Sequence, residues 1–260
     1  MTHASQGTWK MCVLSVWLTG CAIKTPYLPI SHWPVAKQAS YYQQAIPYRV
    51  VVLPLLDERP DQERKGHVAP ATFLLLWNRR VGDYYTGDHI FGGEVATQLA
   101  KQLTDYLQAA NVFAQALYVS SVPQGFDLSN TAMLQQVGRA HAADYLLTGE
   151  LQHFFGSQHQ EFSMFALPLY FISAFGAQES KSLPWGQTTI RFSLVEGRTG
   201  DLVSRHPLDA SATLPRETDS MAEAALTSFT NVAGQLAVEL RRLPLPSDPN
   251  PVANENRHDH

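Results

Sequence analysis

The chain has 260 residues, of which 45% are hydrophobic and 16% are charged, and its formal net charge is −4 at pH 7. This composition excludes an intrinsically disordered chain and a collagen-like chain, and the slightly acidic balance gives no reason to expect nucleic acid as a partner. The length is sufficient for one substantial hydrophobic core.

Residues 1–20 have the order of a secretory signal peptide: Lys10, then an apolar run over 11–18, then the small residues Thr19 and Gly20. The stretch Leu18-Thr19-Gly20-Cys21 resembles the lipobox of bacterial lipoproteins, whose cysteine is acylated and becomes the first residue of the mature protein. The resemblance implies removal of residues 1–20 and attachment of fatty acid, such as palmitate, to Cys21. The alternative is a buried first strand that ends in an ordinary cysteine.

The expected location is the periplasmic face of the outer membrane. Ala22 follows the cysteine, where an aspartate would favour retention in the inner membrane of enterobacteria. No apolar run reaches the roughly 20 residues of a membrane-spanning helix, so the lipid is the expected means of attachment. Because Cys12 leaves with the leader and Cys21 carries the lipid, the two cysteines of the chain form no disulfide.

Residues 21–47 contain four prolines without a sustained period, which predicts a partly extended tether. Residues 48–57 form an apolar, β-branched run typical of a strand buried on both faces. Pro54 has no N–H to donate, so it is expected at the end of this strand or at a bulge.

Three short motifs within residues 48–243 resemble a group of envelope proteins. They are Val52-Leu53-Pro54-Leu55-Leu56-Asp57, the stretch 138–151 ending in Asp-Tyr-Leu-Leu-Thr-Gly149-Glu-Leu, and the turn Glu196-Gly-Arg-Thr-Gly200 with Val203. The group comprises the amino-terminal domain of the Tol translocation protein, the curli secretion-channel lipoproteins and the lipoprotein activators of peptidoglycan synthases. In these families such motifs enter the first strand, the third strand and a hairpin turn.

Hydrophobic periodicity agrees with that placement. It predicts helices over 95–110, 129–142 and 219–242, a strand over 115–120, a third strand containing Gly149, and an antiparallel hairpin of 187–196 with 202–208. Gly149 is expected where another backbone comes close. The predicted fold class is α/β (α+β), a mixed sheet of about five strands in the order β-α-β-α-β-β-β-α, with helices packed on the sheet. Residues 48–243 form a single domain and residues 244–260 a disordered tail.

Two insertions, 58–88 and 156–186, interrupt this pattern and are long for connections. If strands one and three are parallel through right-handed crossovers, both insertions leave from the same edge of the sheet. Each contains apolar residues, which either pack on each other and on the sheet or form one exposed patch that touches a partner or the bilayer. The candidate contact residues are Phe73, Trp77, Phe165, Leu169, Tyr170 and Phe171.

No common catalytic motif is present, so we expect neither an enzyme nor a cofactor or metal site. His153 and His159, with Ser157 and Glu161, could in principle assemble a metal or triad site, but a loop surface is the favoured interpretation. His141 is expected at the core boundary, and the histidines at 258 and 260 lie in the tail. Gly92 and Gly93 precede a helix, where an anion could bind, but no basic residue supports a site there.

The sequence therefore favours a lipid-anchored interaction module that helps assemble, position or activate an envelope machine for secretion, transport or cell-wall synthesis. Its partners would be the outer membrane and an envelope protein. The alternative is an oligomeric outer-membrane secretion pore, against which the stretch 162–172 alternates poorly and contains Pro168. A cell-wall hydrolase is the third possibility and would require a histidine, a carboxylate and a serine in one cleft.

Overall fold

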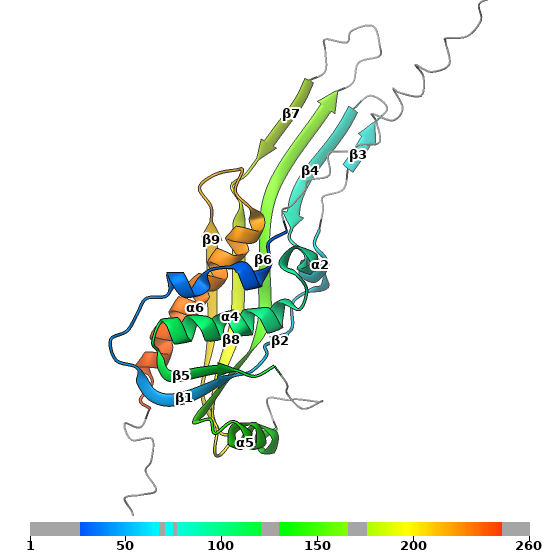
Figure 1. Cartoon of the computed structure of the whole chain (residues 1–260). Coiled ribbons are helices and arrows are strands. Elements are labelled where there is room, and N and C mark those ends of the chain that lie inside the picture. The colour runs from blue at the N-terminus through cyan, green and yellow to red at the C-terminus, as the bar shows by residue number, and fades with distance from the viewer. Residues whose placement is uncertain (1–26, 68–70, 75–76, 121–129, 166–175, 246–260) are drawn as a thin grey trace, which may run out of the picture.

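The structure is a computed structural model that describes residues 27–67, 71–74, 77–120, 130–165 and 176–245 (Figure 1). These residues form one mixed sheet of nine strands with helices packed against it. The predicted α+β class is confirmed. The predicted number of strands is wrong, because both insertions contribute strands to the same sheet.

Strand β1 (Ile46–Val52) pairs in parallel with β5 (Phe113–Tyr118) on one side and with β6 (Tyr145–Phe165) on the other. The side chains of Val50, Val51 and Val52 are all 0% exposed. Because alternate residues of a strand face opposite sides of the sheet, both faces of β1 must be covered. This confirms the predicted doubly buried strand and the parallel arrangement of the first and third core strands.

On its other side β6 pairs antiparallel with β8 (Trp185–Glu196), which pairs antiparallel with β9 (Leu202–Thr213). In the turn between β8 and β9, the hydroxyl of Thr199 donates to the carboxylate of Glu196 at 2.9 Å, and Gly200 has a φ of 74°. Glycine is favoured there because a Cβ is disfavoured at positive φ. The predicted hairpin is confirmed.

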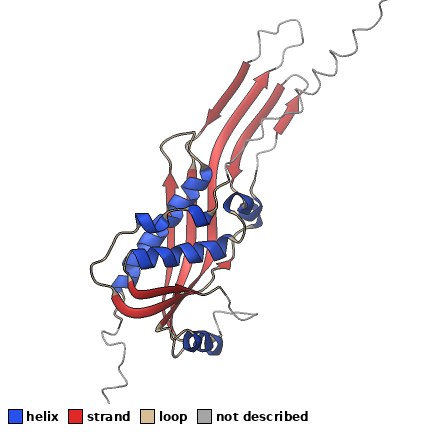
Figure 2. Cartoon of the chain, in the orientation of Figure 1, coloured by secondary structure: helices blue, strands red, loops and turns tan. Residues whose placement is uncertain are grey.

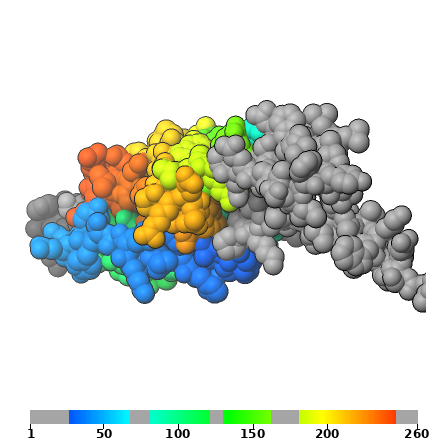
Figure 3. Space-filling view, turned by 90° about the horizontal axis from the view of Figure 1, so that it is seen from above, coloured from blue at the N-terminus to red at the C-terminus, as the bar shows by residue number. Residues whose placement is uncertain are grey.

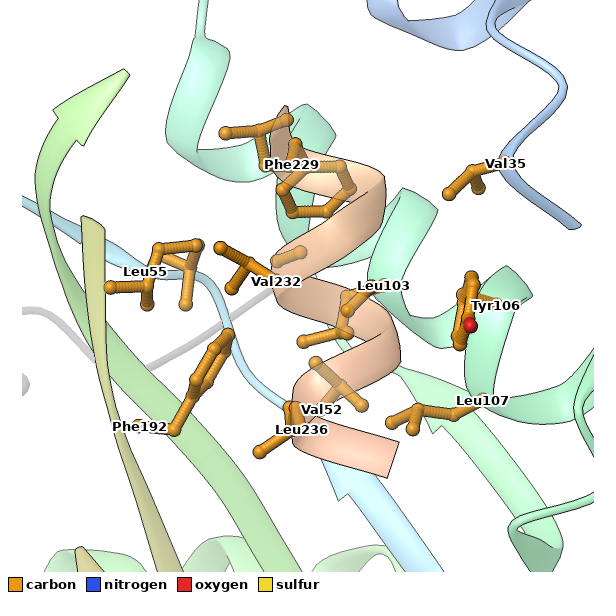
Figure 4. Close-up of a cluster of buried hydrophobic side chains, with 14 of the residues drawn as sticks. Val35, Val52, Leu55, Leu103, Tyr106, Leu107, Phe192, Phe229, Val232 and Leu236 are labelled. Carbon is orange, nitrogen blue, oxygen red and sulfur yellow. The ribbon is translucent and has the colours of Figure 1, made fainter. Parts of the chain in front are cut away.

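Two long helices, α4 (Val95–Ala109) and α6 (Met221–Arg242), cover one face of the sheet (Figure 4). Phe229, Val232 and Leu236 of α6 lie between the sheet and α4, and each buried side chain of this size contributes roughly 1.5–3 kcal/mol. The shorter α5 (Thr131–Ala140) covers the other face through Leu134 and Val137. With β1, β5, β6, β8 and β9, these helices reproduce the predicted order of the core elements.

Residues 27–47 are not the predicted tether. Two 3-10 helices, η1 (Ile30–His32) and η2 (Val35–Gln38), place Ile30 and Val35 in the core at 0% and 1% exposure. The indole N–H of Trp33 donates to the hydroxyl of Thr230 on α6 at 3.1 Å, and the blue start of the chain lies against the orange residues that include α6 (Figure 3). The prolines made this segment look extended, but burial of its apolar side chains stabilises it on the helices.

The remaining elements come from the predicted insertions. They are β2 (Leu56–Asp57), α2 (Asp61–Lys65), β3 (Ala71–Leu74), β4 (Trp77–Tyr85), α3 (Asp88–Phe91) and β7 (Gly176–Lys181). Within the described part of the chain, no helix is both long enough and apolar enough to cross a membrane. Cys21, like the whole leader, lies outside the described residues, as do residues 246–260 of the predicted tail.

Candidate functional site

The two insertions, about 70 residues apart in the sequence, join in one extension of the sheet. Strand β4 pairs antiparallel with the second half of β6, from Tyr85 opposite Ser157 to Trp77 opposite Phe165. Strand β3 adds to the outer edge of β4, and β7 adds to the other edge of β6. We call these four paired segments the extension. It continues beyond the helices of the body (Figure 2).

Three of the predicted contact residues occupy the outermost described positions of the extension. Trp77 stands opposite Phe165, and Leu74 of β3 stands opposite Trp77, so three strands contribute an apolar residue to one row. Phe73 stands one position away, opposite Asn78. We call this end the tip. Leu169, Tyr170 and Phe171 lie outside the described residues, and the exposure of the patch stays a prediction.

Basic residues follow the apolar row at once. Arg79 stands opposite Ser163 and Arg80 opposite Phe162, two and three positions from the tip along β4. Because successive residues of a strand belong to opposite faces, each face of β4 receives one arginine. Glu179 of β7 stands opposite Phe162 in the same row as Arg80, so the extension has an apolar end followed by two arginines and one acidic residue.

A buried arginine fixes the foot of the extension. The guanidinium of Arg59, whose side chain is 0% exposed, donates to both carboxylate oxygens of Asp57 at 2.9 and 2.7 Å. It also donates to both oxygens of Asp88 at 2.9 and 3.1 Å. Arg59, just before α2, thus joins the last residue of β2 to the first residue of α3. We call Asp57, Arg59 and Asp88 the arginine clamp.

The charges of Asp57 and Arg59 shift each other's pKa values. Burial alone would raise the pKa of Asp57, but the hydrogen bonds and the charge of Arg59 outweigh it and hold that pKa below its ordinary value. Burial would likewise lower the pKa of Arg59, but its two carboxylate partners raise it. Asp57 and Arg59 therefore form an ion pair at neutral pH.

A second polar link joins α2 to β6. The carboxylate of Glu63, buried in the fold, lies 2.7 Å from Nδ1 of His153 and accepts the backbone N–H of Phe154 at 3.1 Å. Close by, the hydroxyl of Thr86 accepts the N–H of Gly156 at 2.8 Å. These bonds hold both ends of the first insertion against β6, so the extension has a fixed base.

The start of the described chain also lies at this foot. The N–H of Leu28 donates to the carbonyl of Ile90 in α3 at 2.9 Å, and Tyr27 lies beside Gly92. In Figure 1 the dark-blue start of the chain lies next to α2 and the lower end of β4. Whatever precedes residue 27 therefore leaves the body at the end from which the extension projects.

The histidines do not form the site that their spacing allowed. His153, Ser157, His159 and Glu161 lie on β6, so the expected loop is wrong, although His159 and Glu161 are exposed. His159 pairs with Asp83 of β4 at 3.0 Å. Among the described residues, no group of three or more histidine, cysteine or acidic side chains could hold a metal ion.

The other candidates have structural positions. His141 follows α5 and is half-buried, as expected, and residues 258 and 260 lie outside the described part. Gly92 and Gly93 adopt φ values of 90° and 85°, and the amide of Gln98 donates to both their carbonyls at 3.2 and 3.1 Å.

Pro54 and Gly149 were predicted as structural residues. Pro54 lies just after β1 and before β2, where the ladder requires no N–H from it. Gly149 lies in β6 opposite Phe192, and a Cβ on it would stand 2.8 Å from the carbonyl oxygen of Arg191. The close approach of a second backbone is therefore present.

Sequence reasoning missed the clamp and the Glu63–His153 link. Asp57, Arg59 and Asp88 look like ordinary loop charges, because nothing local marks an arginine as buried. The only signal was the presence of Asp57 and Arg59 at the start of a long insertion and of Asp88 at its end. Such charges are also common in solvated loops.

Comparisons with known proteins show distant structural likenesses. No family model matches the chain, and no curated protein matches it. Protein XCC0632 from Xanthomonas campestris is 12% identical, with a TM-score of 0.41, covering 78% of this chain and 88% of that one. The PelC dodecamer subunit from Paraburkholderia phytofirmans is 9% identical, with a TM-score of 0.37, covering 75% and 93%. Lipoprotein GNA1162 from Neisseria meningitidis is 11% identical, with a TM-score of 0.32, covering 74% and 99%. At these TM-scores, the likenesses carry no functional argument.

Proposed function

We propose that this chain is a lipid-anchored periplasmic interaction module of the bacterial outer membrane. It helps assemble, position or activate an envelope machine for secretion, transport or cell-wall synthesis, and it has no catalytic activity of its own. The observation that carries the proposal is the extension: two insertions that are remote in sequence converge on one apolar tip, whereas the body already buries a complete core. A structure dedicated to contact explains both facts.

The lipobox supports the anchoring part of the proposal. Labelled palmitate should appear in the wild-type protein and be absent from Cys21→Ala, which should still fold and be released from the membrane. Equal labelling of the two proteins would refute acylation at Cys21. Pull-down of wild type after crosslinking in intact envelopes would then identify the protein partner.

The pairing of both insertions gives a specific reason to keep the secretion pore as a second candidate, since pore-forming subunits contribute paired strands. Strands that face lipid need apolar residues at every second position. The odd-numbered positions of β4 include Arg79 and the even-numbered positions include Arg80, so neither face of the strand has only apolar residues. Conductance measurements on the purified protein in planar bilayers decide between the candidates, and the module predicts none.

A hydrolase receives less support. Glu63 is held by His153 and by a backbone N–H of the same strand, which is the arrangement of a structural link between α2 and β6. Loss of peptidoglycan cleavage in a His153→Ala variant that keeps its stability would revive this candidate.

A further inference from the structure

The position of the chain start limits where the membrane can lie. Residue 27 lies at the foot of the extension, held by the hydrogen bond from Leu28 to α3. Five residues lie between Cys21 and Tyr27, and the six Cα–Cα steps, fully extended, span at most roughly 20 Å. A lipid on Cys21 therefore keeps the foot of the extension within this distance of the bilayer surface.

The extension has a matching length. From Ser157 at the foot to Phe165 at the tip, β6 advances by eight residues, which is roughly 26 Å at the rise of a strand. The tip can thus pass the point that Cys21 reaches by roughly 6 Å. Amphipathic segments at a membrane surface bury their apolar side by roughly 5–10 Å, so the two lengths fit one bilayer surface.

The composition of the tip suits that surface. Trp77 and Phe165 stand opposite each other at the tip, and tryptophan is enriched where membrane meets water. Arg79 and Arg80 come immediately behind, where anionic headgroups lie when the apolar row is inserted. A protein partner would explain the apolar row, but it would not require the anchor and the tip to reach the same plane.

We propose that the tip of the extension inserts into the headgroup region of the same bilayer leaflet that holds the lipid of Cys21. The chain then contacts the membrane at two points, the lipid on Cys21 and the tip. The extension points from the body toward the membrane. This inference rests on the proposed acylation of Cys21 and names the bilayer as the occupant of the tip.

The test uses the full acylated chain with one added cysteine that carries an environment-sensitive fluorophore. The mature protein has no other free thiol once Cys12 is removed and Cys21 is acylated, so labelling is specific. Phe165→Cys and Phe73→Cys place the probe at the tip. The matched control is Tyr41→Cys, at a residue that is 70% exposed. Tyr41 lies near the end of α4 that is remote from the extension, since the N–H of the next residue, Tyr42, donates to the carbonyl of Ala110.

Each labelled protein is reconstituted in vesicles of phosphatidylethanolamine and phosphatidylglycerol that contain brominated lipid as a quencher. We expect blue-shifted, quenched emission at both tip positions and unquenched emission at the control. Arg79→Gln with Arg80→Gln should weaken the tip quenching in these vesicles and leave it unchanged in phosphatidylcholine vesicles.

Two failures are distinguishable. If palmitate is attached to the vesicle-bound protein but neither tip position is quenched, the bilayer contact is refuted, the anchor stands, and a protein becomes the occupant of the tip. If the protein carries no palmitate and does not bind vesicles, the proposed anchor fails, and this inference fails with it.

Discussion

Replacement of Arg59 by methionine tests the base of the extension. The change keeps much of the apolar stem and removes the guanidinium, which leaves the carboxylates of Asp57 and Asp88 without their shared cation. Breaking a buried pair by removing one partner costs about 3–5 kcal/mol. The two carboxylates are 27% and 28% exposed, so water partly compensates, and we expect the free energy of unfolding to fall by about 3 kcal/mol.

Urea unfolding of the purified chain measures this change, and Arg64→Met is the matched control. Arg64 lies five residues further on, with a side chain 44% exposed and an ion pair to Asp61 on the surface of α2, so its loss should leave the unfolding midpoint unchanged. Adding Asp88→Asn to Arg59→Met should restore part of the lost stability, because one uncompensated carboxylate is removed. Equal midpoints for Arg59→Met and Arg64→Met would refute the clamp.

Four further predictions concern two glycines, Asp57 and the tip. Gly149→Val should lower the free energy of unfolding by about 1–3 kcal/mol, because its Cβ would press on the carbonyl of Arg191; an unchanged melting temperature would contradict this. Gly186→Ala should cost about 3 kcal/mol, since the added Cβ collides with the backbone of α6 at Ala224, and calorimetry measures it. The pKa of Asp57 is lowered in the folded state, so its ionised form stabilises the fold above an unfolded pKa of about 3.9. This stabilisation is lost as the pH falls through the folded pKa. In an acid titration, Arg59→Met should therefore lose less free energy of unfolding over that pH window than wild type. Changing both Phe73 and Phe165 to serine should abolish membrane or partner association in sedimentation assays with little change in melting temperature, and retained association would exclude the tip.

The core could be predicted because its signals are local. Three consecutive valines mark β1, the turn at Thr199 and Gly200 marks the hairpin, and apolar spacing marks α4 and α6. Each signal lies within one element and agrees with its neighbours, so the order of elements followed directly.

The extension could be predicted only in part. The direction of both insertions follows from the parallel pairing of β1 with β6, which the sequence order implies. Their strands were missed because residues 157–161 of β6 are polar without alternation, and pairing with β4 across a long sequence separation determines their conformation.

The buried parts of the first insertion and of residues 27–47 were missed for related reasons. Arg59 is buried because two carboxylates satisfy it, and those partners are distributed over the ends of an insertion. Ile30 and Val35 are isolated apolar residues among prolines, and only the surface of α4 and α6 makes them core residues.

The most direct test of the account is photocrosslinking in intact envelopes with a photoreactive amino acid in place of Phe165 at the tip or of Tyr41 on the body. The extension account predicts abundant adducts, with lipid under the bilayer proposal or with a protein otherwise, from position 165, and none above background from position 41. Adducts from position 41 alone, or equal adducts from both positions, would contradict it, because the body and not the extension would then make the contact.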